Sequence, residues 1–115
     1  MYKFSYAEIV EDSGEEGRSR EQMALDRALE LMSIAQQNGA ASPEARTAIA
    51  YIQKLWNFLI EDLINPENSL TEQLRGDLIS IGIWVIREAD RILLDPTRNF
   101  AALIEVNKSI RDGLR

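Results

Sequence analysis

Residues 80–94 read SIGIWVIREADRILL and place apolar side chains around most of the circumference of the helix that they are expected to form. A helix that is apolar on nearly every side is either enclosed by its own chain or left open for a partner. The other apolar stretches of the sequence are easier to assign to a core. This stretch therefore decides how the chain folds and how much apolar surface remains after folding.

The helix that contains this stretch is predicted from about residue 70 to residue 94. Ser69-Leu70-Thr71-Glu72 fits a capping box at its start, and Asp95-Pro96 ends it. One apolar row covers about 100° of arc, the width of a core-facing stripe. We predict that this row faces the core, and it consists of Leu70, Leu74, Leu78, Ile81, Val85, Ala89 and Ile92. A second row consists of Ile79, Ile83, Ile86, Leu93 and Leu94.

Three further long helices are predicted from apolar residues at helical spacing. The first spans about residues 20–38 and ends at Asn38-Gly39. The second begins with Ser42 as N-cap and Pro43 at the first helical position, and Asn65-Pro66 ends it. The last spans about residues 100–114. Short turns between long helices favour antiparallel neighbours in a bundle.

The first 17 residues differ from the rest. Ser5-Tyr6-Ala7-Glu8 fits a capping box between the apolar Phe4 and Ile9 and predicts a short N-terminal helix. DSGEEG, residues 12–17, is predicted to form an acidic hinge. We therefore predict an all-α fold, a compact antiparallel bundle of four main helices plus a short N-terminal helix. Residues 1–115 form a single helical domain, with 1–17 as the N-terminal segment and 18–115 as the bundle.

The composition excludes most catalytic chemistry. The chain has no Cys and no His, so it lacks the residues of a thiolate or imidazole metal site, a Cys nucleophile or a Ser-His-Asp triad. Adjacent carboxylates at Glu15-Glu16 and Glu61-Asp62 point to different helix faces and have no basic partner at matching spacing. We predict that the protein is not an enzyme and uses no cofactor or metal ion.

Charge and hydropathy limit the environment of the protein. The net charge is −6, which disfavours contact with a phosphate backbone. The basic residues toward the C-terminus are interleaved with acidic ones, and cations at helix C-termini are favourable for the helix dipole alone. No signal peptide and no membrane-spanning run are recognised. These features predict a cytoplasmic protein without direct nucleic-acid contact or membrane insertion.

A partner site is predicted where large side chains lie outside the core-facing sectors. Tyr51 and Phe58, seven residues apart, form an aromatic ridge. Ile83 belongs to the second apolar row of its helix, and Trp84 projects near the polar sector. Three of the eight aromatic residues fall within the first six positions and are predicted to form a movable cover: Tyr2, Phe4 and Tyr6. We expect these seven residues to border a protein-binding surface. Burial within the monomer, or within a homodimer, is the alternative.

Four segments, in this order and at these spacings, give the chain a family resemblance: MYKFSYAEI, KLWNFLIEDL, LISIGIWVIREADRI and IRDGLR. The sequence resembles the flagellar biosynthesis regulator FlaF family of alphaproteobacteria along essentially its whole length. Family members often have Leu-Pro at Leu70-Thr71 and Ala at Gly76, and both differences are compatible with a helix. No functional residue of the family is carried across by position.

The resemblance implies a cytoplasmic protein needed for the production and export of flagellin. It implies flagellin as the partner, with the translational regulator FlbT as a second one. We therefore expect a non-enzymatic flagellin-binding export chaperone or adaptor that couples flagellin synthesis to secretion. The alternative is a post-transcriptional regulator that acts on flagellin mRNA directly or through FlbT. The sequence leaves open whether the protein is a monomer or a homodimer.

Overall fold

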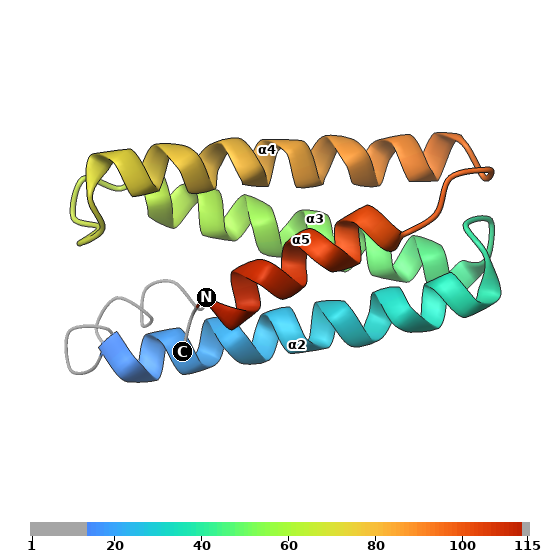
Figure 1. Cartoon of the computed structure of the whole chain (residues 1–115), viewed down its shortest axis with the longest axis horizontal. Coiled ribbons are helices and arrows are strands. Elements are labelled where there is room, and N and C mark those ends of the chain that lie inside the picture. Colours follow the sequence, from blue (N-terminus) through green and yellow to red (C-terminus); the bar gives the residue numbers. More distant parts are fainter. Residues whose placement is uncertain (1–13, 114–115) are drawn as a thin grey trace.

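Four helices follow one another along the chain, each antiparallel to the one before it (Figure 1). The computed structural model describes residues 14–113 and shows α2 (Gly14–Asn38), α3 (Pro43–Ile64), α4 (Glu72–Leu94) and α5 (Ala101–Asp112), with no strand in that range. The prediction of an all-α fold is confirmed. The short N-terminal helix predicted from Ser5 lies outside the described residues.

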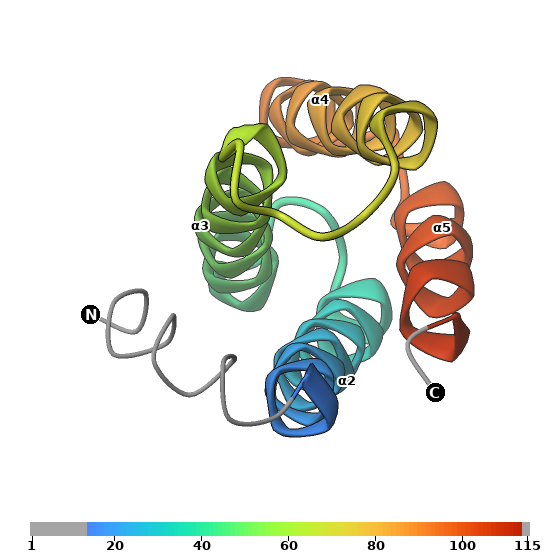
Figure 2. The same cartoon turned by 90° about the vertical axis from the view of Figure 1, so that its left-hand side faces the viewer.

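Seen along their axes, the four helices form a ring in which α2, α3, α4 and α5 follow one another (Figure 2). The closest packing joins α3 to α4 and α2 to α3, and α5 packs on α2 far more than on α4. The molecule measures 43 × 23 × 23 Å along its principal axes. The bundle is therefore well closed on the sides of α2 and α3 and weakly closed between α4 and α5.

The turn between α2 and α3 follows the predicted signals. Gly39 adopts φ 97°, the left-handed conformation that ends many helices, and its N–H donates to the Ala35 carbonyl at 2.8 Å. The Ser42 side chain accepts from the Ala45 N–H at 3.1 Å, and Pro43 begins α3. Asn65 is the C-cap of α3. These local signals fix the antiparallel α2–α3 pair.

Two helix starts differ from the prediction. α2 already begins at Gly14, so part of the predicted hinge is helical; Gly17 is buried, and this packing outweighs the low helix propensity of glycine. The cap of α4 is Thr71 rather than Ser69, and its side chain accepts from the Leu74 N–H at 3.2 Å. The Asn68 side chain accepts from the Leu70 N–H at 2.9 Å, and this turn keeps Ser69 outside the helix.

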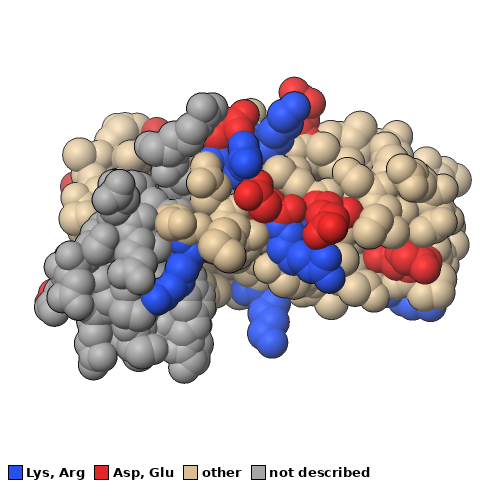
Figure 3. Space-filling view, turned by 90° about the horizontal axis from the view of Figure 1, so that it is seen from below, with Lys and Arg blue, Asp and Glu red and all other residues tan. Residues whose placement is uncertain are grey.

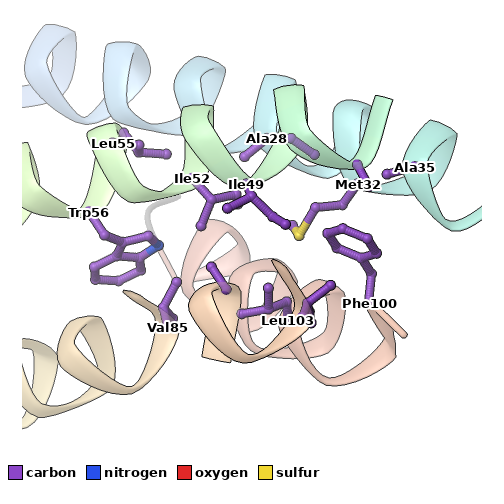
Figure 4. Close-up of a cluster of buried hydrophobic side chains, with 14 of the residues drawn as sticks. Ala28, Met32, Ala35, Ile49, Ile52, Leu55, Trp56, Val85, Phe100 and Leu103 are labelled. Carbon is purple, nitrogen blue, oxygen red and sulfur yellow. The ribbon is translucent and has the colours of Figure 1, made fainter. Parts of the chain in front are cut away.

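The core is an apolar cluster built from all four helices (Figure 4). Its fully buried members include Leu25, Met32, Ile52, Trp56, Val85, Ile92, Phe100 and Leu103. A polar link crosses it, because Trp56 Nε1 donates to Asn107 Oδ1 at 2.7 Å. The Asn107 amide in turn donates to the Leu103 carbonyl at 2.8 Å. Both polar side chains are thus satisfied where water is absent, and α5 is fixed in register on α3.

Gly82 allows α4 to approach α3 closely. A Cβ atom at this position would lie 2.8 Å from Trp56 Cε3 and 3.0 Å from the Ile60 side chain. Real Cβ atoms do not come so near to a buried ring, so the Trp56 indole occupies the space that any other residue at position 82 would need. The glycine is therefore required by packing, not by backbone conformation.

The two glycines of α4 offer a matched test of this packing. Gly82→Ala should destabilise the protein by about 1–3 kcal/mol, because overpacking outweighs the gain in helix propensity. Gly76→Ala should stabilise it by about 1 kcal/mol, since no atom lies within 4 Å of the added Cβ. Urea denaturation of both variants measures the difference. Stabilisation by both substitutions would show that Gly82 is not a packing constraint.

Candidate functional site

The apolar row of α4 that the sequence assigns to the core is buried along only half its length. Val85, Ala89 and Ile92 have no exposed surface, as predicted. Leu70 and Leu74 are 39% and 43% exposed, so their assignment to the core is wrong. Leu78 and Ile81, between the two halves, are half-buried. We refer to Leu70, Leu74, Leu78 and Ile81 as the open leucine face.

The length of α5 explains why this face is open. α5 has 12 residues and spans about 18 Å, whereas the 23 residues of α4 span about 35 Å. α5 also starts beside the C-terminal end of α4 and inclines toward α2 as it proceeds (Figure 1). α5 thus lies beside the second half of α4 only, where Phe100 and Leu103 share the core cluster with Val85, Ala89 and Ile92. Among the described helices the first half of α4 packs mainly on α3.

Trp84 and Ile83, both predicted site residues of α4, have different environments. Trp84 is half-buried and packs against the core cluster, and it follows Ile81 by one helical turn. Ile83 is 41% exposed. Because adjacent helical residues project about 100° apart, the two side chains do not share one surface. Trp84 is therefore the member of this pair that borders the leucines.

Tyr51 and Phe58 lie on the other side of the bundle, where α3 packs on α2. The Tyr51 hydroxyl donates to the Ala24 carbonyl of α2 at 3.3 Å, and Phe58, two turns further along α3, has the same orientation. Both side chains are half-buried. The structure thus separates this pair, which we call the aromatic seam, from Trp84. The other predicted site residues, Tyr2, Phe4 and Tyr6, lie outside the described residues.

Three basic side chains in the last quarter of the chain, those of Arg91, Arg98 and Arg111, form ion pairs. Glu88 is buried and accepts from Arg91 and Arg98, each at 3.1 Å. Arg111 pairs with Asp26 across the α2–α5 contact. Basic and acidic side chains also alternate on the face that α2 presents in Figure 3. These cations stabilise the contacts between helices and do not form a continuous basic surface there.

The described part of the chain offers little to a small ligand or metal ion. A surface hollow of about 190 Å³ at the α2–α3 turn is lined by Leu31, Ile34, Pro43, Glu44 and Thr47. Pockets for small molecules usually enclose more space. Residues 14–113 contain no group of acidic side chains arranged for a metal ion, and no helix among them is long and apolar enough to cross a membrane. The open leucine face is the main feature that calls for a partner.

Comparison with known proteins gives one match. The family model of the flagellar protein FlaF matches residues 2–114, nearly the whole chain. The chain belongs to the FlaF family of flagellar proteins. No curated protein and no solved structure matches it significantly. FlaF membership connects the chain to the flagellum, and the geometry above must indicate how it acts there.

The stability that Tyr51 contributes to this FlaF protein depends on pH. Burial raises the pKa of the Tyr51 phenol above its ordinary 10.0, and the charge of Arg27 offsets part of this rise. The folded state thus holds the proton more tightly than the unfolded state. The resulting stability is fully present below about pH 10 and is lost as the pH rises through the folded pKa.

We expect the stability advantage of the wild type over Tyr51→Phe to narrow as the pH rises above about 10. Urea midpoints of both proteins at neutral and alkaline pH measure this difference. Absorbance of the phenolate provides the titration directly. Parallel loss of stability in the two proteins would show that the Tyr51 phenol is equally accessible to water in the folded and unfolded states.

Proposed function

We propose that this protein is a non-enzymatic, cytoplasmic flagellin-binding chaperone or export adaptor that couples flagellin synthesis to secretion. The observation that carries the proposal is the open leucine face of α4. Leu70 and Leu74 expose apolar surface on the same side of the helix that α5 covers further along. Exposed apolar rows that continue a buried one are typical of protein-binding surfaces. FlaF membership makes a flagellar partner the natural occupant.

The shape of the face favours a helical segment as ligand. Leu74, Leu78 and Ile81 recur at intervals of four and three residues, so they form a strip along the helix axis. An amphipathic helix can place its own apolar strip against such a row, with anchors at the same spacing. A partner helix in this position would cover the first half of α4 in the way that α5 covers the second half. The hydrophobic helical ends of flagellin have this chemistry.

Trp84 would lie at the junction between the partner helix and α5. Its indole is half-buried against the core and borders the leucine strip through Ile81. Aromatic side chains at the centre of a contact often contribute a large share of the binding energy. Because Trp84 also packs against the core, its replacement by Ala would reduce both stability and binding. The exposed leucines are better positions for separating these two effects.

Regulation of flagellin translation, on the mRNA or through FlbT, is the alternative function. Direct contact with RNA is disfavoured by the net charge of −6, and Arg91, Arg98 and Arg111 are engaged in ion pairs with acidic side chains of the protein itself. Action through FlbT needs no contact with RNA and is compatible with a binding surface for proteins. A chaperone that is occupied by unexported flagellin can report the state of export to such a regulator.

Two leucines of α4 provide a matched test of flagellin binding. Leu74→Ala should weaken binding of purified flagellin at least about tenfold, or about 1.4 kcal/mol, because it removes an anchor of the leucine strip. Leu94→Ala, on the same helix but 82% exposed and away from this face, should leave the affinity unchanged. Titration calorimetry measures both affinities, and thermal melts show whether each variant remains folded.

Equal affinities of the two variants would contradict the assignment of the site. Flagellin without its terminal segments serves as the second control and should not bind. Light scattering of the free protein adds a further check. A stable dimer that is lost in Leu74→Ala would assign the face to a second copy of the chain instead of flagellin.

A further inference from the structure

We propose that the aromatic seam between α2 and α3 is the docking site of the chain's own N-terminal segment, residues 1–13. The seam contains Tyr51 and Phe58 and lies away from the open leucine face. This inference does not depend on flagellin as the partner. It assigns five of the seven predicted site residues to an intramolecular contact, on its two sides, and leaves the leucine face of α4 for other proteins.

The position at which α2 begins supports this occupant. Gly14 lies at the end of the bundle where α3 ends (Figure 1). Phe58 is six residues before the end of α3 and Tyr51 is thirteen, so they lie roughly 9 Å and 20 Å from that end. Thirteen residues span roughly 20 Å even as a helix and roughly 43 Å when extended. The segment therefore reaches both aromatic rings along the seam.

The composition of the segment fits an apolar and aromatic contact. Six of its thirteen residues have large apolar or aromatic side chains: Met1, Tyr2, Phe4, Tyr6, Ile9 and Val10. Tyr51 and Phe58 are both half-buried. Aromatic pairs stabilise a contact by about 0.5–1.5 kcal/mol beyond the burial of their area. The seam offers a surface on which such pairs can form.

Charge also favours this contact. The segment carries Glu8, Glu11 and Asp12 against the single base Lys3, a net charge of −2. Three cations lie along the seam. Arg27 is near enough to Tyr51 to affect the pKa of its phenol. Arg20 lies two turns before Arg27 on α2, and Lys54 lies between Tyr51 and Phe58 on α3. Arg27 also pairs with Glu30 at 2.8 Å, and both side chains are more than half exposed.

Docking of the segment would strengthen the contact between the first turns of α2 and the last turns of α3. This end of the α2–α3 pair is the most distant from the Gly39–Ser42 turn that connects the helices. A segment held by Tyr51 and Phe58 would act as a strap across both helices. It would also remove the exposed aromatic surface of the seam from contact with unrelated proteins.

A single spin label can locate the segment in the full-length protein. The chain has no native cysteine, so Ser5→Cys carries a label at that position alone and keeps the aromatic residues of the segment. Paramagnetic broadening of amide signals then reports which residues lie near it. We expect the signals around Tyr51 and Phe58 to lose more intensity than those around Leu74 and Ile81. In the labelled protein that also carries Phe58→Ala, this difference should decrease.

Three results would overturn the proposal. Stronger broadening around Leu74 and Ile81 would place the segment on the open leucine face. Uniformly weak broadening would mean that the segment contacts neither surface. The same broadening pattern with and without Phe58→Ala would show that the seam is not responsible for the contact. None of these results depends on flagellin, so failure here is distinguishable from failure of the proposed function.

Discussion

Trp56 is the side chain through which three of the helices are held in register. It projects from α3, its ring occupies the space beside Gly82 of α4, and its indole N–H donates to Asn107 of α5. A buried indole N–H without an acceptor would cost about 1–3 kcal/mol, so α5 is constrained to present Asn107 at this point. The contacts of Trp56 therefore explain both the glycine at position 82 and the buried asparagine at position 107.

The position of α5 follows from this constraint and from its contacts with α2. The Phe100 N–H donates to the Gln36 side chain at 2.7 Å, and Arg111 pairs with Asp26. These contacts hold α5 on α2 at both of its ends. A helix of 12 residues that is held in this way cannot also cover the first half of α4. The open leucine face is thus a consequence of how α5 is anchored.

Sequence alone predicts the elements of this fold well where the signals are local. Ser42, Pro43 and Gly39 set the α2–α3 turn, and apolar periodicity identifies the buried rows of α2 and α3. It fails where the outcome depends on another helix. Leu74 and Val85 belong to one row, and only the length and inclination of α5 determine that Val85 is buried while Leu74 is exposed. Likewise, the sequence shows Gly82 only as a residue of low helix propensity, and the need for a glycine follows from the Trp56 ring beside it.

The candidate site shows the same limit. A helical wheel marks Tyr51 and Trp84 as outside the core stripes of their helices, but it does not place the two helices relative to each other. Once they are placed, Tyr51 bonds to Ala24 of α2, whereas Trp84 borders the open leucine face. Residues that share a pattern in the sequence thus belong to two different surfaces.

The central claim is that the partner binds to the first half of α4, which α5 does not reach. Hydrogen exchange on the free protein and on its mixture with flagellin tests this claim most directly. The account predicts that amides in the first half of α4, around Leu74 to Ile81, gain protection from exchange when flagellin is added. The amides of α3 around Tyr51 and Phe58 should remain as they are in the free protein. Protection confined to the α2–α3 side, with α4 unchanged, would contradict the account.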